Sequence, residues 1–208
     1  MNLVFDFGAV LFSWQPIQLV QANLGEHAPT AEAARRLAHA IFSHEDWLAF
    51  DRGHSSLDQA IDAIARRLDL PAVSLDAMLS PVGERMAPIA ETVALLAQLR
   101  TRREQGGSLR LFYLSNMPSP YARQLEARHE FLRWFDGGVF SGDVQAIKPE
   151  ARIYQLLAER HGLEPARTVF IDDMPDNVLA ARNLGWHAIH FETAAALAQQ
   201  LQGHGLLS

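Results

Sequence analysis

MNLVFDFG, residues 1–8, places a single carboxylate, Asp6, at the end of an apolar run. Residues Asn2–Phe7 are rich in apolar and aromatic side chains and stop at Gly8, which is typical of a short, buried β-strand. Asp6 on its own could simply cap a turn at the end of that strand. The residues at the ends of the other strands decide between this interpretation and a functional one.

Four further segments have the character of strands, and apolar helical periods lie between them. The two clear ones are Leu109–Leu114 (LRLFYL) and Thr168–Ile171 (TVFI). The two weaker ones are His187–Phe191 and Gly138–Phe140. Strands that alternate with helices predict an α/β fold, a doubly wound parallel sheet with helices on both faces.

Residues 15–87 interrupt this alternation, because they contain helical patterns and no convincing strand. The clearest helix has an apolar stripe from Leu57 to Leu68 and begins after Ser55 or Ser56, either of which can serve as its N-cap. We therefore expect a helical insertion, residues 15–87, after the first strand. The sheet domain would consist of residues 1–14 and 88–208.

Composition limits the classes of function. The chain has 208 residues, 49% of them hydrophobic, which is enough for a sizeable core in one domain or a domain with an insertion. Its net charge of -6, without a basic run, argues against nucleic acid as the main partner. It has no cysteine, no signal-peptide pattern and no apolar stretch long enough for a membrane helix. We expect a cytoplasmic protein with no membrane partner, and the oligomeric state stays open.

Polar side chains follow the predicted strands, at the point where each strand ends. In open parallel sheets, ligands bind beyond the carboxyl ends of the strands. The residues placed there are Asp6, Ser115, Asn116, Lys148, Asp172 and Asp173.

The chemistry of this set points to phosphoryl transfer. Three carboxylates gathered at one edge would repel one another unless a cation joined them, and Mg²⁺ prefers carboxylate, water and phosphate oxygens. Ser115, Asn116 and Lys148 are donors suited to anionic oxygens. A carboxylate beside a metal and such donors can act as a nucleophile on phosphorus.

Four motifs resemble those of the haloacid dehalogenase-like (HAD) hydrolase superfamily. They are VFDFGAVL, LSN, the lysine of IKPEARIY and FIDDMPDNVLAA, and they occur in order over nearly the whole chain. The resemblance implies a Rossmann-like core with a small helical cap at residues 15–87. Within the superfamily, the first and third motifs look most like a branch of sugar-phosphate phosphatases that includes the α-D-glucose-1-phosphate phosphatase type.

This resemblance also implies a metal site. Asp6 and Asp173 would bind Mg²⁺ together with the main-chain carbonyl of Gly8, and Asp172 would contribute through a water or from behind the ligands. Asp176 is a less favoured metal ligand. On the simpler interpretation, the two adjacent acids cap the helix near Pro175, but we expect Asp176 or Asn177 to do so.

The remaining roles concern the phosphate. Asp6 would attack phosphorus and become an aspartyl phosphate, Ser115 and Asn116 would hold the phosphate oxygens, and Lys148 would neutralise phosphate and nucleophile. Most phosphatases of the superfamily carry a second aspartate where this chain has Gly8. That acid protonates the leaving oxygen, and such catalysis is worth about 10²–10⁴-fold.

Without it, the chain should be slow on ordinary alkyl phosphates or must find its proton elsewhere. A hexose 1-phosphate eases the problem, because its anomeric oxygen leaves more readily than an ordinary alcohol. A polar cluster in the insertion, His44, Glu45 and Asp46, is a candidate replacement acid, although such clusters are usually exposed helix surface. Trp14, Trp47 and Phe50 could cover a sugar ring, but packing within the insertion is the expected role.

Two other functions compete with a phosphatase. A 2-haloacid dehalogenase also lacks the second aspartate, but it needs no metal and grips the substrate carboxylate with an arginine, for which Arg35, Arg36 and Arg52 are candidates. A phosphatase-like binding protein without turnover would not need the nucleophile. The acids at 172 and 173 argue against the first, and the retained Asp6 argues against the second.

Overall fold

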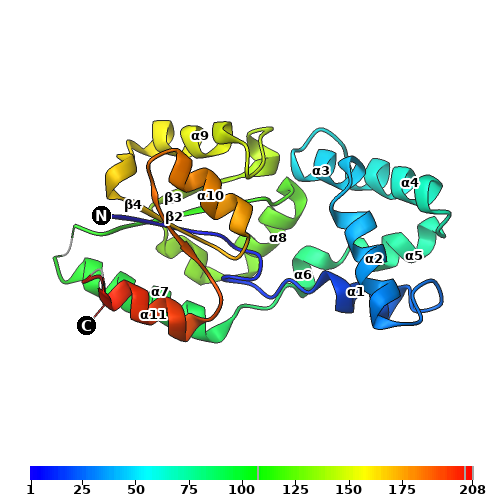
Figure 1. The fold of residues 1–208 in the computed structure, drawn as a ribbon, viewed down its shortest axis with the longest axis horizontal. Coiled ribbons are helices and arrows are strands. Elements are labelled where there is room, and N and C mark those ends of the chain that lie inside the picture. Colours follow the sequence, from blue (N-terminus) through cyan, green and yellow to red (C-terminus); the bar gives the residue numbers. More distant parts are fainter. Residues whose placement is uncertain (107, 204, 208) are drawn as a thin grey trace.

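A computed structural model describes residues 1–106, 108–203 and 205–207 and contains a five-stranded parallel sheet beside a group of helices (Figure 1). The strand order is β3-β2-β1-β4-β5, and every neighbouring pair is parallel. The strands are β1 (Asn2–Phe5), β2 (Arg110–Ser115), β3 (Gly137–Phe140), β4 (Thr168–Asp172) and β5 (His187–His190). The predicted α/β fold with a doubly wound parallel sheet is confirmed.

The central strand, β1, is the place where the direction of winding reverses. From β1 the chain builds outward to β2 and β3, and then returns to the other side of β1 for β4 and β5. Phe5 lies opposite Tyr113 of β2 and Ile171 of β4, so these three strands end side by side. Ligands of open α/β sheets bind at such a reversal, and Asp6 directly follows it.

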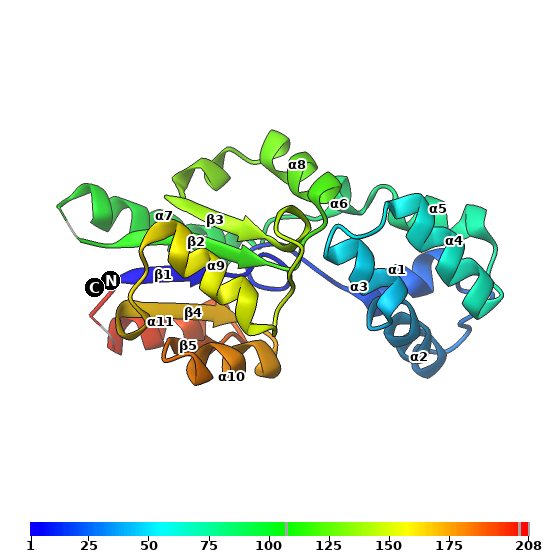
Figure 2. The same cartoon turned by 90° about the horizontal axis from the view of Figure 1, so that it is seen from above.

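Helices cover both faces of the sheet because successive side chains of β1 point to opposite sides. Leu3 and Phe5 belong to one apolar cluster, and Val4 belongs to another. The first face carries α7 (Ala90–Glu104), α8 (Ser119–Arg128) and α11 (Ala194–Gly203), and the second carries α9 (Ala151–His161) and α10 (Pro175–Asn183) (Figure 2). Three short 3-10 segments complete the connections: η1 (Glu130–Trp134), η2 (Ser141–Asp143) and η3 (Pro165–Arg167).

Between β1 and α7 the described chain forms six helices and no further strand of the sheet. They are α1 (Pro16–Asn23), α2 (Ala31–Phe42), α3 (Glu45–Asp51), α4 (Leu57–Leu68), α5 (Ala72–Leu79) and α6 (Val82–Arg85), and they lie beyond the carboxyl ends of the strands (Figures 1 and 2). The N-cap of α4 is Ser56, which forms a reciprocal capping box with Gln59. None of the helices in the described part of the chain has the length and apolar composition needed to cross a bilayer.

The first strand is shorter than the sequence predicts, since it ends at Phe5 and not at Phe7. The Asp6 amide still donates to the carbonyl of Ile171, but the Phe7 amide turns back and donates to Oδ1 of Asp6. The Phe7 carbonyl then accepts the amides of Leu11 and Phe12. This tight turn fixes the Asp6 carboxylate at the sheet edge.

Candidate active site

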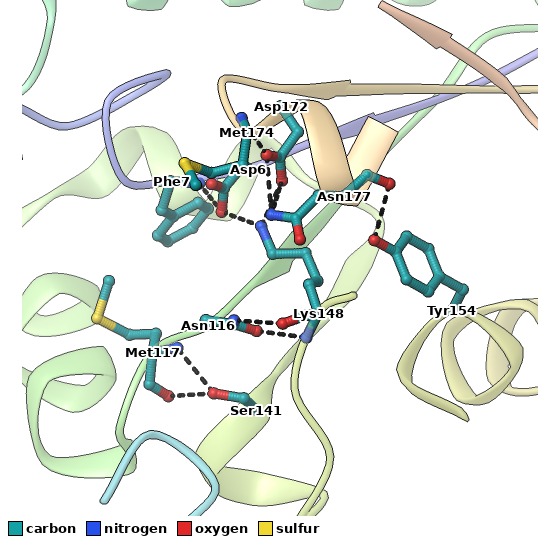
Figure 3. Close-up of polar contacts among 10 residues, drawn as sticks. All are labelled: Asp6, Phe7, Asn116, Met117, Ser141, Lys148, Tyr154, Asp172, Met174 and Asn177. Atoms are coloured by element: carbon teal, nitrogen blue, oxygen red, sulfur yellow. Dashed lines mark hydrogen bonds and ion pairs between the residues drawn. The ribbon is translucent and has the colours of Figure 1, made fainter. Parts of the chain in front are cut away.

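A buried ammonium group joins the acids of two neighbouring strands. Lys148 Nζ lies 2.8 Å from Asp6 Oδ1 and 2.6 Å from Asp172 Oδ2 (Figure 3). Lys148 is only 3% exposed, Asp6 7% and Asp172 not at all. Paired charges this far from water bind strongly to one another, and losing either partner would leave an uncompensated charge.

Asp172 is held in place by several donors. Besides Lys148, its oxygens accept hydrogen bonds from the Met174 amide at 2.8 Å and from Nδ2 of Asn177 at 3.0 and 3.2 Å. The expectation that Asp176 or Asn177 caps α10 is wrong, because the N-cap residue is Met174 and no side chain caps the helix. The Met174 amide and the Asn177 side chain both donate hydrogen bonds to Asp172 instead. Asp172 therefore holds the Lys148 ammonium in position and does not itself line the cavity.

Asn116 positions the same lysine through its backbone. Its Oδ1 accepts the Lys148 amide at 2.7 Å, and its Nδ2 donates to the Lys148 carbonyl at 3.0 Å (Figure 3). These two bonds connect the end of β2 to the loop before α9. The side-chain amide of Asn116 is thus engaged with protein, and its contact with a phosphate oxygen stays a prediction.

The carboxyl groups have pKa values shifted toward the neutral form. Burial raises the pKa of Asp6 to about 7, with a contribution from Asp172, although Lys148 opposes the shift. Burial and then Asp172 also raise the pKa of Asp173. Burial alone would lower the pKa of Lys148, but Asp172 and Asp6 raise it above its usual value. Three acids share one ammonium group, so the site is short of positive charge.

The acid cluster fits a hard divalent cation. Asp6, Asp172 and Asp173 each offer one oxygen, and these three oxygens lie within 4.8 Å of one another. Carboxylate oxygens are the ligands that Mg²⁺ prefers, and its charge would offset the repulsion among the three acids. Because Asp172 already accepts bonds from Lys148 and Asn177, Asp6 and Asp173 are the better candidates for direct ligands.

These residues line one cavity of about 250 Å³ between the sheet edge and the insertion. The polar residues on its wall from the sheet domain are Asp6, Gly8, Ser115, Asn116, Lys148, Asp173 and Asn177. Its apolar wall consists of Trp14, Phe42, Trp47, Leu48, Val82, Met86, Met117, Pro118, Tyr121 and Met174. The structure thus brings the predicted site residues together around this cavity. Asp172 is the exception, since it contacts Lys148 without lining the cavity.

The aromatic residues Trp14, Trp47 and Phe50 divide between the two roles considered for them. Trp14 and Trp47 line the cavity, and their rings each pack edge-on against Phe42. Phe50 is not among the lining residues and packs against Trp47 and Tyr121. Trp14 and Trp47 can therefore contact a substrate, whereas Phe50 supports them.

The other candidates from the insertion lie away from the cavity. Arg35 and Arg36 pair with Glu32 on the exposed side of α2, and Arg52 pairs with Glu45 and Glu150. Among the described residues, no arginine lines the cavity. His44 and Glu45 are exposed, and Asp46 pairs with Arg67, so this cluster is surface.

Among the carboxyl and amide side chains of the cavity wall, two have no site role predicted from the sequence, Asn177 and Asp51. Asn177 was interpreted only as a helix cap. Asp51 is 8% exposed and shares the buried face of α3 with Trp47 and Phe50. A carboxyl at helical spacing from two buried aromatic residues is the signal that could have found it.

Comparisons with known proteins identify the family and the fold. A family model described as haloacid dehalogenase-like hydrolase matches residues 13–185. The chain is 26% identical over 200 residues to the sesquiterpene phosphatase astK of Aspergillus oryzae, covering 96% of this chain and 93% of that protein.

Solved structures show the same fold at lower identity. A HAD family enzyme of Bacteroides thetaiotaomicron, in complex with magnesium and inorganic phosphate, superimposes with a TM-score of 0.70 at 19% identity, covering 94% of this chain and 98% of that one. The L-2-haloacid dehalogenase of Xanthobacter autotrophicus gives 0.66 at 22% identity, covering 97% and 82%.

Proposed function

Because the chain belongs to the haloacid dehalogenase-like hydrolase family, we propose that it is a Mg²⁺-dependent phosphatase that hydrolyses a small phosphorylated metabolite through an aspartyl phosphate on Asp6. The observation that carries this proposal is the buried Lys148 ammonium, which bridges Asp6 and Asp172 at the wall of the cavity between the sheet domain and the insertion. Asp173 completes a set of acids that calls for a cation.

In the first step, a carboxylate oxygen of Asp6 bonds to phosphorus and the bond from phosphorus to the ester oxygen breaks. Lys148 keeps the nucleophile ionised and neutralises charge on the phosphoryl oxygens, and Asp172 and Asn116 keep it in position. Ser115, which is buried at the end of β2, and Asn116 would bind phosphoryl oxygens. Bound Mg²⁺, held by Asp6, Asp173 and the Gly8 carbonyl, would supply further positive charge for the phosphate.

The leaving group would occupy the part of the cavity that the insertion lines, and the insertion would act as a cap that excludes bulk water. A sugar phosphate such as a hexose 1-phosphate is one candidate substrate. Trp14 and Trp47 offer aromatic faces for a sugar ring, and an anomeric oxygen leaves more readily than an alkyl alcohol. The small cavity favours metabolites over phosphoproteins.

The apolar wall favours a second candidate, the phosphate ester of an apolar alcohol. Phe42, Leu48, Val82 and Met86 add aliphatic and aromatic surface and no hydroxyl-binding group. The similarity to a protein named as a sesquiterpene phosphatase supports this candidate. Both candidates require the same chemistry at Asp6 and differ only in what fills the cavity.

The competing functions account less well for the site. A dehalogenase needs a cation for the substrate carboxylate, yet the arginines proposed for it pair with glutamates outside the cavity. It also has no use for the excess of acids around Asp6. A binding protein without turnover would not need the buried Lys148 paired with Asp6.

A substrate panel tests the proposal. Inorganic phosphate would be measured after incubation with both anomers of a hexose 1-phosphate, a hexose 6-phosphate and farnesyl phosphate, each with Mg²⁺ and with excess chelator. We expect phosphate release that stops on chelation, and none from the Asp6→Asn variant. Release that survives chelation would contradict the metal mechanism, and halide release from 2-chloropropionate would favour the dehalogenase.

A further inference from the structure

One carboxyl from the insertion reaches the cavity wall, and the mechanism above gives it no role. Asp51, at the end of α3, lines the same cavity as Asp6, Gly8 and Lys148. We propose that Asp51 is the general acid and base of the reaction, supplied by the insertion in place of the acid that Gly8 lacks. This inference rests on the proposed phosphatase function.

The backbone of Asp51 is fastened to the sheet domain. The hydroxyl of Ser141 donates to the Asp51 carbonyl at 2.6 Å and accepts the Met117 amide at 2.8 Å. Ser141 is fully buried, and Met117 directly follows Asn116 of the proposed phosphate site (Figure 3). The end of α3 is therefore held at a fixed place relative to the residues that would bind phosphate.

The adjoining residue, Gly53, shows how closely the two parts meet. Its φ of +76° is in the region that favours glycine, and an added Cβ would lie 2.5 Å from the Gly142 carbonyl oxygen. Such an approach leaves no room for a side chain. The same turn thus brings Asp51 to the cavity and closes the insertion against the core.

The surroundings of Asp51 suit a group that exchanges a proton near neutral pH. Burial raises the pKa of Asp51 to about 7, although a hydrogen bond from the Trp47 side chain and the charges of Arg52 and Lys148 oppose the shift. The Tyr121 hydroxyl, on the facing helix α8, donates to the Leu79 carbonyl. Asp51 is therefore protonated in a large share of molecules at pH 7, which is what an acid in one step and a base in the next requires.

The other acidic groups of the cavity already have proposed roles. Among the described residues, the carboxyls on its wall are those of Asp6, Asp51 and Asp173. Asp6 is the nucleophile, and Asp173 lies within the acid cluster that fits a cation. Asp51 alone lies on the insertion side, where the leaving group would sit.

Two proton transfers complete the reaction. As Asp6 bonds to phosphorus, the electron pair of the breaking bond stays on the ester oxygen, and the Asp51 carboxyl gives that oxygen its proton, so that a neutral alcohol leaves. In the second step, water attacks the phosphorus of the aspartyl phosphate and gives a proton to the Asp51 carboxylate. Inorganic phosphate leaves, Asp6 is an ionised carboxylate again and Asp51 is protonated again.

The rates on two esters of similar size distinguish a general acid at Asp51 from a residue that is only structural. 2-Phenylethyl phosphate has an alcohol leaving group that needs a proton, whereas 4-nitrophenyl phosphate has a leaving group that departs as an anion. For Asp51→Asn, which keeps an acceptor for Trp47, we expect kcat/KM on the first ester to fall by about 10²–10⁴-fold. On the second ester, kcat/KM should fall by less than about tenfold, with a burst of nitrophenol as the aspartyl phosphate accumulates.

The matched control is Asp62→Asn, which removes an exposed acid of α4 in the same insertion and should leave both rates unchanged. A rescue variant is available at Gly8, where an added Cβ would lie 3.7 Å from Trp14, an ordinary contact. Gly8→Asp in the Asp51→Asn background should recover part of the lost rate on 2-phenylethyl phosphate. The wild-type kcat/KM for that ester should fall above pH 7, and Asp51→Asn should abolish this dependence.

Equal losses on both esters, or no loss on either, would overturn the assignment of Asp51 while leaving the phosphatase in place. An unchanged pH profile in Asp51→Asn would overturn it as well. If the wild-type protein released phosphate from neither ester nor from the substrate panel, the proposed function itself would fail, and the role of Asp51 with it.

Discussion

Arg52 at the end of α3 and Glu150 at the start of α9 form an ion pair of 2.6 Å that joins the insertion to the sheet domain. Next to it, Gly53 packs directly against the Gly142 backbone. Both contacts flank Asp51 and lie close in sequence to Lys148. The proposed catalytic groups of the two parts of the chain are therefore brought together by one small contact region.

Gly53→Ala should lower activity by displacing the groups in this contact region while the protein still folds. The added Cβ meets a backbone oxygen that cannot move aside, so we expect kcat/KM to fall by about tenfold or more, the scale of a small misplacement of catalytic groups. The control is Gly162→Ala, which has a similar φ of +61° but open space around its Cβ. The left-handed backbone should cost each variant about 1–2 kcal/mol of unfolding free energy, and the clash should add to this loss in Gly53→Ala only. Steady-state kinetics and urea unfolding measure the two effects, and equal losses of activity would contradict the account.

Lys148→Met should cost both stability and activity. It leaves Asp6 and Asp172 buried without their ammonium partner, and breaking such a pair costs about 3–5 kcal/mol. Adding Asp172→Asn should restore part of the unfolding free energy without restoring turnover. Urea unfolding in the absence of Mg²⁺ measures this cycle, and a double variant no more stable than Lys148→Met would show that the two charges are not coupled.

Mg²⁺ should raise the melting temperature of the wild-type protein. A ligand that binds only the folded state at 100 times its Kd adds about 2.7 kcal/mol. Asp173→Asn should remove most of this stabilisation, whereas Asp176→Asn, which neutralises an exposed acid nearby, should keep it. Thermal unfolding with and without Mg²⁺ gives the comparison, and an identical response of the two variants would speak against Asp173 as a ligand.

Asp51 should make wild-type stability fall as pH rises. Burial raises its folded-state pKa to about 7, so the folded protein binds this proton more tightly than the unfolded chain does. The stability that the bound proton contributes is present below the unfolded pKa of about 3.9 and is lost between about pH 4 and 7. Asp51→Asn lacks this dependence, so its stability relative to wild type should increase from pH 5 to pH 8. Urea unfolding at both pH values measures the difference, and a constant difference would exclude the raised pKa.

The sheet and most of the site could be predicted from the sequence because the signals are local. A short apolar run with a polar residue at its end identifies a buried strand and the residue that it presents. This logic placed Asp6, Ser115 and Asp172 at neighbouring strand ends, where the structure has them. Only the exact ends differ, as at β1, where hydrogen bonds of the turn replace those of the ladder.

Roles that depend on partners distant in sequence could not be predicted in the same way. Asn116 was expected to hold phosphate, yet its side chain binds the Lys148 backbone, which only the folded chain brings near. Asp51 could not be placed because helical periodicity shows that α3 has a buried face but not what that face meets. The cluster of His44, Glu45 and Asp46 is easier to notice in the sequence, but it lies on the surface, where Asp46 pairs with Arg67.

The central claim is that Asp6 attacks phosphorus with Lys148 beside it. Its most direct test is the rate of Mg²⁺-dependent phosphate release by Asp6→Asn, measured on the substrate that the wild-type protein cleaves best. Removing a nucleophile should lower kcat by about 10³-fold or more while thermal unfolding shows an intact fold. Turnover at the wild-type rate would contradict the account.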